Sequence, residues 1–169
     1  FSAWEVCASI DGTGPTGEYI RTGLKWDKWL ENWEHGMKFQ NRRNKILNLD
    51  FTITTAGIWE IEKMFELSLK YDQKIITKQT FAFSPEVFMS VRAIPKPILQ
   101  RIIGDILDRI KPRSTRKQKG MIDQLSLLID QPHFSDIDQS VSPHRAQSCT
   151  PIPLDWEQWL ERPPIYIWV

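Results

Sequence analysis

Apolar and polar residues alternate in three short stretches of the chain, and longer stretches with a helical period separate them. Residues 3–10, 46–54 and 74–83 show the two-residue period that is typical of β-strands. Between them, residues 18–40 and 58–71 carry apolar side chains every three or four positions, which predicts amphipathic helices. The pattern therefore predicts the order strand, helix, strand, helix, strand.

Such an order, with long crossovers between strands, predicts an α/β fold with a parallel sheet, either half of a barrel or part of a doubly wound sheet. Residues 13–17 are rich in glycine and proline and are expected to form a loop. Gly23 divides the first helical stretch into a short turn over residues 18–22 and a main helix from Trp26. Because Phe1 begins inside a predicted core strand, we expect the chain to be a fragment.

The pattern changes character after Pro85. Residues 96–110 predict a helix with a continuous buried stripe, and residues 121–130 predict another. Proline, serine and scattered polar residues from position 131 onward predict irregular structure. The expected organisation is an α/β unit over residues 1–95, a helical extension over 96–130 that contains a basic linker at 111–120, and an irregular, partly disordered tail over 131–169.

Composition narrows the function classes. With 41% hydrophobic and 25% charged residues among 169, the chain is expected to be globular. A net charge of +1 does not indicate a nucleic-acid partner, and the five cations of residues 111–119 have no interleaved aromatic side chain. We see neither a membrane-spanning run nor a secretory signal, and expect no membrane partner. Cys7 and Cys149 could form one disulfide, but we expect two buried or free thiols in a reducing, cytoplasmic setting.

Candidate chemistry gathers where the first strand ends. Ser9 and Asp11 are two residues apart, so they share one face of the strand, and ligands collect at this end of parallel strands. A hydroxyl beside a carboxylate suits the hydroxyl groups of a ribose or sugar. From composition alone, Asp11 equally suits a cap on turn amides, and Arg21 suits a solvated arginine or a partner of Glu18.

The sequence motifs of this segment resemble those of a known enzyme family. The segment reads Ser9-Ile10-Asp11-Gly12, a short loop, Glu18-Tyr19-Ile20-Arg21, a glycine, and then a helix with tryptophan and asparagine. This order of motifs resembles radical S-adenosylmethionine enzymes, especially the branch with SPASM or twitch extensions. Ile94-Pro95 is similar to a junction that follows the barrel in that branch. The resemblance covers about residues 3–100.

The resemblance implies a partial (β/α)6 barrel of the TIM-barrel type, with residues 1–95 as its fourth to sixth strands and their helices, followed by a helical tail. The implied cofactors are S-adenosylmethionine and a [4Fe–4S] cluster. Ser9 is implied to contact the ribose, Arg21 the methionine carboxylate, with Asp11 and the strand-end Thr54 as weaker cofactor contacts. The intact enzyme would reductively cleave S-adenosylmethionine and abstract hydrogen from a peptide or small-molecule substrate.

The chain departs from that family in more than one respect. The Cys-x-x-x-Cys-x-x-Cys triad that ligates the cluster is absent, as are cysteines for an auxiliary cluster. We therefore expect this chain alone to be inactive, to supply no metal ligand, and to represent the C-terminal half of the domain. Two alternatives stay open. One is another α/β-barrel enzyme that uses Asp11 and Glu18 as carboxylates. The other is a non-catalytic interaction module whose surface is the basic linker and the tryptophan-rich helix, with an exposed tryptophan stripe.

Overall fold

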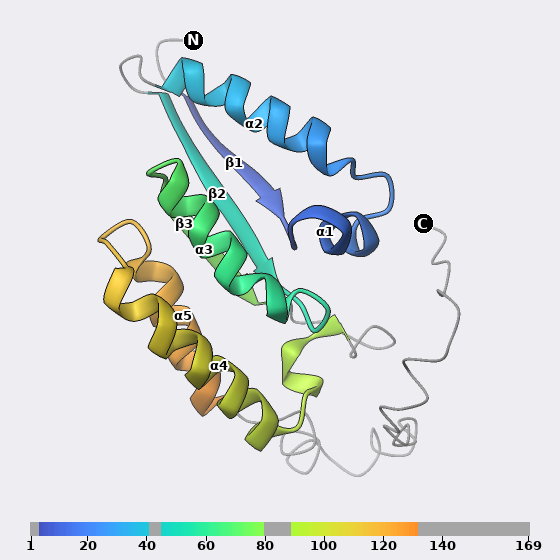
Figure 1. Cartoon of the computed structure of the whole chain (residues 1–169), viewed down its shortest axis with the longest axis vertical. Coiled ribbons are helices and arrows are strands. Elements are labelled where there is room, and N and C mark those ends of the chain that lie inside the picture. Colours follow the sequence, from blue (N-terminus) through green and yellow to red (C-terminus); the bar gives the residue numbers. More distant parts are fainter. Residues whose placement is uncertain (1–3, 41–44, 80–88, 132–169) are drawn as a thin grey trace. The chain divides into compact units, whose positions relative to one another are not determined.

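Three parallel strands form the centre of the protein. The structure is a computed structural model that describes residues 4–40, 45–79 and 89–131. β1 (Trp4–Ile10), β2 (Lys45–Ile53) and β3 (Ile75–Gln79) lie in the order β1-β2-β3, and both pairs are parallel (Figure 1). The predicted α/β class and the predicted parallel sheet are confirmed. The predicted extension of the third strand to Phe83 lies outside the described residues.

Helices connect the strands and follow the last one. They are α1 (Gly14–Ile20), α2 (Trp26–Gln40), the 3-10 turn η1 (Ile58–Glu60), α3 (Ile61–Lys70), the 3-10 turn η3 (Val91–Ala93), α4 (Lys96–Ile110), the 3-10 turn η4 (Lys111–Arg113) and α5 (Lys119–Asp130). The predicted break near Gly23 is confirmed, because this glycine has a φ of +87° between α1 and α2. The helices predicted from the apolar stripes of residues 58–71, 96–110 and 121–130 are confirmed in type and nearly in extent.

The loop predicted over residues 13–17 is wrong, because α1 begins at Gly14. Pro15 occupies the first turn, where a proline loses no intrahelical hydrogen bond and its fixed φ favours the helix. The helix also needs a glycine at position 17. A Cβ there would lie 2.3 Å from the carbonyl oxygen of Gly12. Glycine in this segment therefore serves close packing of a helix against a strand end.

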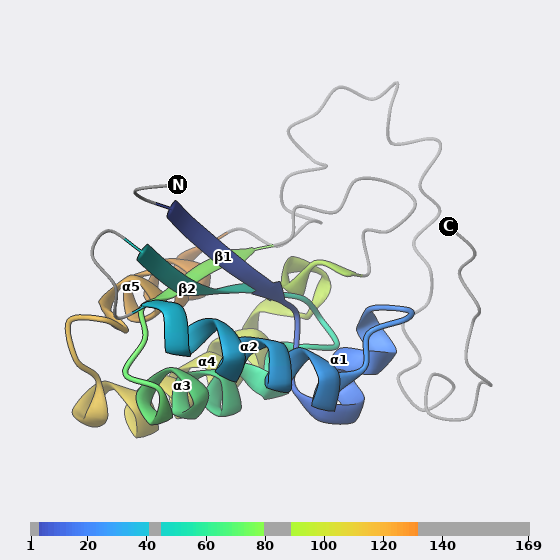
Figure 2. The ribbon, with the colours of Figure 1, turned by 90° about the horizontal axis from the view of Figure 1, so that it is seen from above.

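The two faces of the sheet differ in composition. One face, here called the helix-covered face, carries the apolar positions Val6, Ala8, Ile10, Leu47, Leu49, Phe51, Ile53 and Ile75. α2 and α3 lie on this side of the sheet (Figure 2). The opposite face, here called the polar face, carries Glu5, Cys7, Ser9, Asn48, Asp50, Thr52 and Lys78 together with Ile46 and Ile76. Since strand side chains alternate, the two sets come from neighbouring residues.

One hydrophobic core joins the sheet to the helices on both sides of residue 95. Buried residues run from Ile10 in β1 to Leu128 in α5. α5 packs against β3 and α4, and α4 packs against α3. The helices predicted as an extension over residues 96–130 therefore share the core of the α/β unit.

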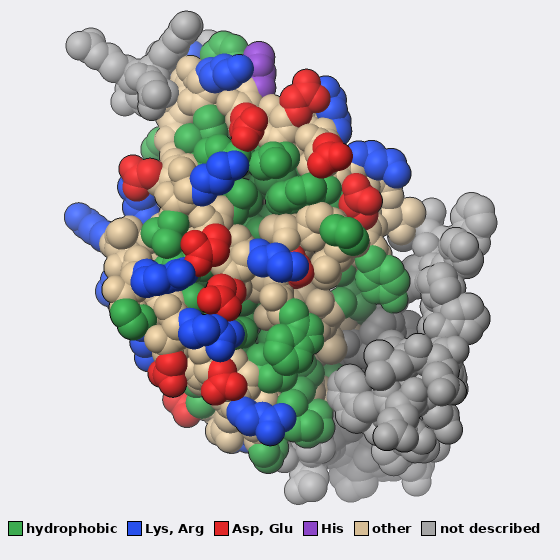
Figure 3. Space-filling model, in the orientation of Figure 1, with side chains coloured by type: hydrophobic (Ala, Val, Ile, Leu, Met, Phe, Trp, Pro, Cys, Tyr) green, Lys and Arg blue, Asp and Glu red, His purple; other side chains and the backbone are tan. Residues whose placement is uncertain are grey.

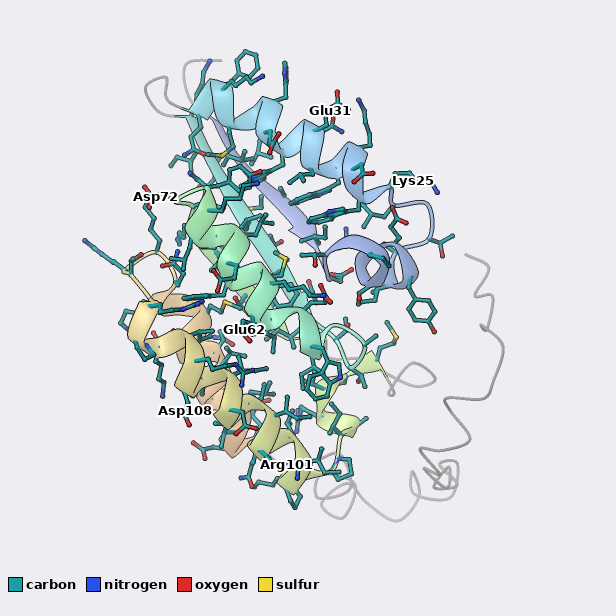
Figure 4. All side chains as sticks on the ribbon, in the orientation of Figure 1. Lys25, Glu31, Glu62, Asp72, Arg101 and Asp108 are labelled. Atoms are coloured by element: carbon teal, nitrogen blue, oxygen red, sulfur yellow. The ribbon has the colours of Figure 1, made fainter. Side chains whose placement is uncertain are left out.

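The segment predicted to be a basic linker is attached to the fold. Arg113 of η4 pairs with Glu66 of α3, and Lys117 pairs with Asp72 at 2.6 Å. Gln118 is buried and donates from Nε2 to Ser68 Oγ at 2.8 Å. Cationic and anionic side chains are interspersed over the helices (Figure 3). Figure 4 shows Glu62 on α3 at the side of α4, where it pairs with Arg109 at 3.0 Å.

Two further expectations concern a membrane partner and the tail from position 131 onward. None of its helices has the length and apolar character needed to cross a membrane. The tail predicted to be irregular and partly disordered lies outside the described residues from position 132 onward.

Candidate functional site

The carboxyl ends of β1 and β2 bring Ser9, Asp11 and Arg21 together. Ser9 is the penultimate residue of β1, Asp11 follows the strand, and Arg21 follows α1. The Arg21 guanidinium donates from Nη1 to the Ser9 carbonyl oxygen at 3.3 Å. α1 turns the chain back over the strand end, and this turn allows residues twelve positions apart to meet.

The same guanidinium holds the Asp11 carboxylate at two points. Nε donates to Oδ2 at 2.5 Å, and Nη2 donates to Oδ1 at 3.3 Å. The Asp11 side chain is 12% exposed and the Arg21 side chain is 41% exposed. A guanidinium has five N–H donors, so two remain beyond the three described contacts. Arg21 can therefore face a third acceptor group while it keeps its contacts with Asp11 and Ser9.

Ser9 also connects this edge to the polar face of the sheet. Its Oγ donates to Asp50 Oδ2 at 2.7 Å, and Lys78 Nζ reaches the same oxygen at 2.6 Å. The Asp50 side chain is 6% exposed and the Lys78 side chain is 54% exposed. The other carboxylate oxygen, Asp50 Oδ1, is buried and accepts no hydrogen bond in the structure. One hydroxyl, one carboxylate and one ammonium thus come from three adjacent strands.

Glu60 fixes the loop between β1 and α1. Its Oε2 accepts hydrogen bonds from the backbone N–H and the hydroxyl of Thr13, and its Oε1 accepts one from Lys63 Nζ at 2.7 Å. Burial alone would raise the pKa of Glu60, but the hydrogen bonds from Lys63 and Thr13 outweigh it and lower the pKa below the ordinary 4.5. Glu60 is therefore a buried anion that ties η1 to the start of α1.

Thr54 supports the edge from the β2 side. Its Oγ1 accepts a hydrogen bond from the Gly57 backbone N–H at 2.9 Å, and its side chain is buried. A Cβ on Gly57 would lie 2.5 Å from the Asp11 carbonyl oxygen. Thr54 thus closes a turn that touches the Asp11 backbone. Among the described residues, no hydrogen bond joins the Thr54 side chain to Ser9 or Arg21.

The metal ligands of an iron–sulfur cluster are not found in the described part of the chain. Residues 4–40, 45–79 and 89–131 contain no group of three or more His, Cys, Asp or Glu side chains that could hold a metal ion. Cys7 is exposed on the polar face, and Cys149 lies outside the described residues. The residues therefore do not fit a [4Fe–4S] cluster.

A separate hollow lies on the helix-covered face. It measures about 240 Å³ and is lined by Val6, Ala8, Trp29, Asn32, Trp33, Gly36 and Leu47. Its lining is almost wholly apolar, and it faces away from Ser9 and Asp50. Charged or hydroxylated ligands have few polar partners there, so the candidate site is the strand-end edge together with the polar face.

Three residues of this arrangement were not predicted from the sequence: Asp50, Lys78 and Glu60. The sequence could have indicated Asp50. Its neighbours Leu49 and Phe51 are apolar and share one face of the strand, so Asp50 must lie on the opposite, polar face. Glu60 had no comparable signal, since its position in a helical pattern gives no sign of a contact with Thr13, 47 residues away.

Comparison with known proteins adds no relative. No protein-family model matches the chain, and neither a curated protein nor a solved structure shows significant similarity to it.

Proposed function

We propose that this chain is the S-adenosylmethionine-binding half of a radical S-adenosylmethionine domain. The observation that carries the proposal is the meeting of Ser9 and Arg21 at the carboxyl end of a parallel strand. The resemblance in sequence implies that these two residues face one ligand, and the Arg21 guanidinium contacts the backbone carbonyl oxygen of Ser9. The parallel order of β1, β2 and β3 suits the fourth to sixth strands of a partial barrel.

In this proposal the chain binds and orients the cofactor. Ser9 Oγ keeps acceptor capacity for a ribose hydroxyl while it donates to Asp50. The two remaining N–H groups of Arg21 would bind the methionine carboxylate, and Asp11 would hold the guanidinium in place. Bound S-adenosylmethionine would supply the hydrogen-abstracting radical only after it had received an electron from a [4Fe–4S] cluster whose ligands this chain lacks. Because the residues do not fit the cluster, no reaction step is assigned to this chain.

The first alternative, a carboxylate-based barrel enzyme, gains less support. It requires Asp11 and Glu18 to converge on a pocket. Glu18 Oε1 instead accepts a hydrogen bond from the Trp26 backbone N–H at 2.8 Å, which caps the start of α2. Asp11 is held by Arg21. The two carboxylates therefore serve separate contacts.

The second alternative, a non-catalytic interaction module, requires an exposed tryptophan stripe on α2. Trp26, Trp29 and Trp33 stack in series with ring centroids 5.2 and 5.7 Å apart. Trp33 is only 3% exposed, and the other two pack against the core. This stripe stabilises the helix on the sheet, so it offers little free surface to a partner.

Isothermal titration calorimetry of the 169-residue chain with S-adenosylmethionine tests the proposal. We expect saturable binding that Arg21→Ala weakens by about tenfold or more, because a charge-assisted contact is lost. Arg21→Lys should weaken it less. Adenosine has no carboxylate, so its affinity should not respond to either substitution. Arg109→Ala removes another ion-paired arginine, on α4, and serves as the control.

The proposal is overturned if S-adenosylmethionine gives no saturable signal, or if Arg21→Ala and Arg109→Ala behave alike. The reading frame upstream of Phe1 provides an independent test. A Cys-x-x-x-Cys-x-x-Cys triad within about a hundred residues would supply the missing cluster ligands. An upstream frame without cysteines would contradict the radical chemistry.

A further inference from the structure

β1 is an edge strand in the described part of the chain, because the strand order is β1-β2-β3. The N–H of Leu49 bonds to the Lys74 carbonyl oxygen, so Leu49 directs its backbone groups toward β3 and its two neighbours direct theirs toward β1. In the parallel register of β1 and β2, the backbone groups of Glu5, Cys7 and Ser9 then point away from β2. These three residues form the outer edge of β1.

Arg21 closes one end of the outer edge, because its Nη1 donates to the Ser9 carbonyl oxygen at 3.3 Å. Glu5 and Cys7 are exposed and face no strand in the part of the chain that the structure describes. Each of them offers one backbone N–H and one carbonyl oxygen. Donors and acceptors at the spacing of a strand are matched by another extended backbone, so the outer edge suits a peptide.

The apolar hollow lies between this edge and α2, on the helix-covered face (Figure 2). Val6 and Ala8 line it from β1, Trp29 and Trp33 line it from α2, and Val6 is 47% exposed. Its volume of about 240 Å³ is below the ~300–1,000 Å³ of sites for whole small molecules, so it suits a single apolar side chain. A residue opposite Val6 in an added strand would point to the same side as Val6 and could fill the hollow.

Glu5 selects the charge of the neighbouring position in the partner. Its side chain lies on the polar face and is exposed, and its Oε1 accepts a hydrogen bond from Asn48 Nδ2 at 2.7 Å. No ion pair joins Glu5 to another described residue. Opposite charges on facing strand positions attract and like charges repel, so a basic residue is favoured opposite Glu5. Because such a pair is exposed, it sets the register of the partner more than its affinity.

We propose that the outer edge of β1 binds a separate peptide in an extended conformation. The peptide backbone pairs with Glu5 and Cys7, an aliphatic side chain opposite Val6 enters the hollow, and a basic side chain lies opposite Glu5. A small apolar molecule in the hollow would leave the backbone groups of the edge unpaired. A second copy of β1, paired antiparallel through the same two residues, would place Cys7 opposite Glu5 and would supply no cation. A basic, amphipathic peptide strand fits all three features.

The test is an NMR titration of the ¹⁵N-labelled 169-residue chain with acetyl-Val-Lys-Leu-Lys-Val-amide, whose alternation fits either strand direction. We expect saturable shifts of the Glu5 and Cys7 backbone amides, and slower hydrogen exchange of both in the complex. Cys7→Pro removes an N–H that points away from β2 and should weaken binding by about tenfold or more. Cys7→Ser keeps that N–H and should bind like the parent chain. Equal affinity of the two variants, or no saturable shift in the parent chain, overturns the inference.

Two further comparisons separate backbone pairing from apolar adsorption and from general charge attraction. The same peptide, N-methylated at its three central residues, keeps its side chains but loses its N–H donors, so it should not bind. Glu5→Lys should weaken the unmodified peptide about fivefold, and the spectra report whether each variant is folded. Glu31→Lys reverses an exposed glutamate on α2 (labelled in Figure 4) and should have no effect. Binding of the methylated peptide, or equal effects of the two charge reversals, contradicts the inference.

Other occupants of the outer edge give different results. Analytical ultracentrifugation without peptide detects self-association, and a dimer that protects the Glu5 and Cys7 amides from exchange would overturn the inference in favour of a second copy. Protection of the same amides in the monomeric chain without peptide would also overturn it, because the edge would then be filled already. The inference does not rest on the proposed function, since the peptide contacts neither Asp11 nor Arg21. A failed titration with S-adenosylmethionine would overturn the proposed function and leave peptide binding standing.

Discussion

Consecutive residues of β2 meet opposite environments on the two faces of the sheet. Leu49 and Phe51 point to the helix-covered face, where both are fully buried among apolar side chains. Asp50, between them, is also buried but touches a hydroxyl and an ammonium. The first face contributes fully buried apolar side chains to the core, whereas the second holds a buried carboxylate with one oxygen that accepts no hydrogen bond. Functional chemistry is therefore expected on the second face.

Phe51→Ala should give the largest effect. It empties a fully buried site on the helix-covered face, and comparable truncations cost about 3–5 kcal/mol of unfolding free energy. Asp50→Asn, one residue away on the polar face, should lower it by less, about 2 kcal/mol, because the size is kept but a buried acceptor of Ser9 and Lys78 loses its charge. Urea unfolding measures both. Equal losses would contradict the division of roles between the faces.

Glu60→Gln tests the contacts that fix the loop between β1 and α1. The substitution should lower the unfolding free energy by about 2 kcal/mol at neutral pH, because it weakens the hydrogen bonds that Thr13 and Lys63 donate to a buried anion. The folded-state pKa of Glu60 lies below its ordinary 4.5, so its contribution is full above that pH and is lost as pH falls through the folded-state value. Urea midpoints of parent and variant should therefore converge on acidification. A pH-independent gap would show that charge is not the cause.

Gly57→Ala should destabilise by about 1–2 kcal/mol, because the new Cβ would press on the Asp11 carbonyl oxygen and on Thr54 Oγ1. Gly104→Ala should have the opposite effect on stability. A Cβ at this position in α4 meets nothing within 4 Å, so better helix propensity should stabilise by about 0.5–1 kcal/mol. Thermal melts of both variants suffice. Stabilisation by Gly57→Ala would mean that the two strand ends are not in close contact.

Asn48→Ala should give the smallest loss of unfolding free energy, about 1 kcal/mol. Asn48 Nδ2 donates to Glu5 Oε1 at 2.7 Å on the polar face, and Glu5 is exposed enough to regain water. Chemical unfolding at two salt concentrations measures the loss, which should change little with salt because only one partner is charged. A loss as large as that of Phe51→Ala would show that the polar face is a second core.

The sequence determined the elements of this protein and their order. Period-two and helical patterns are local, so β1 to β3, α2, α3 and α4 could be read from neighbouring residues. The family resemblance implied that Ser9, Asp11 and Arg21 contact one cofactor, but the ion pair between Arg21 and Asp11 was not predicted. α1 was missed because a glycine- and proline-rich segment has poor helix propensity, and packing of Gly17 on Gly12 outweighs that propensity.

The tertiary structure alone decided which polar residues meet. Asp50, Lys78 and Ser9 come from three strands, and their contacts depend on the register that pairs Ser9 with Asp50 and Asp50 with Ile76. Glu60 reaches Thr13 across 47 residues for the same reason. Hydrophobic period is a property of each segment by itself, whereas register arises only when segments pack together. The unsatisfied oxygen of Asp50 is a product of that packing.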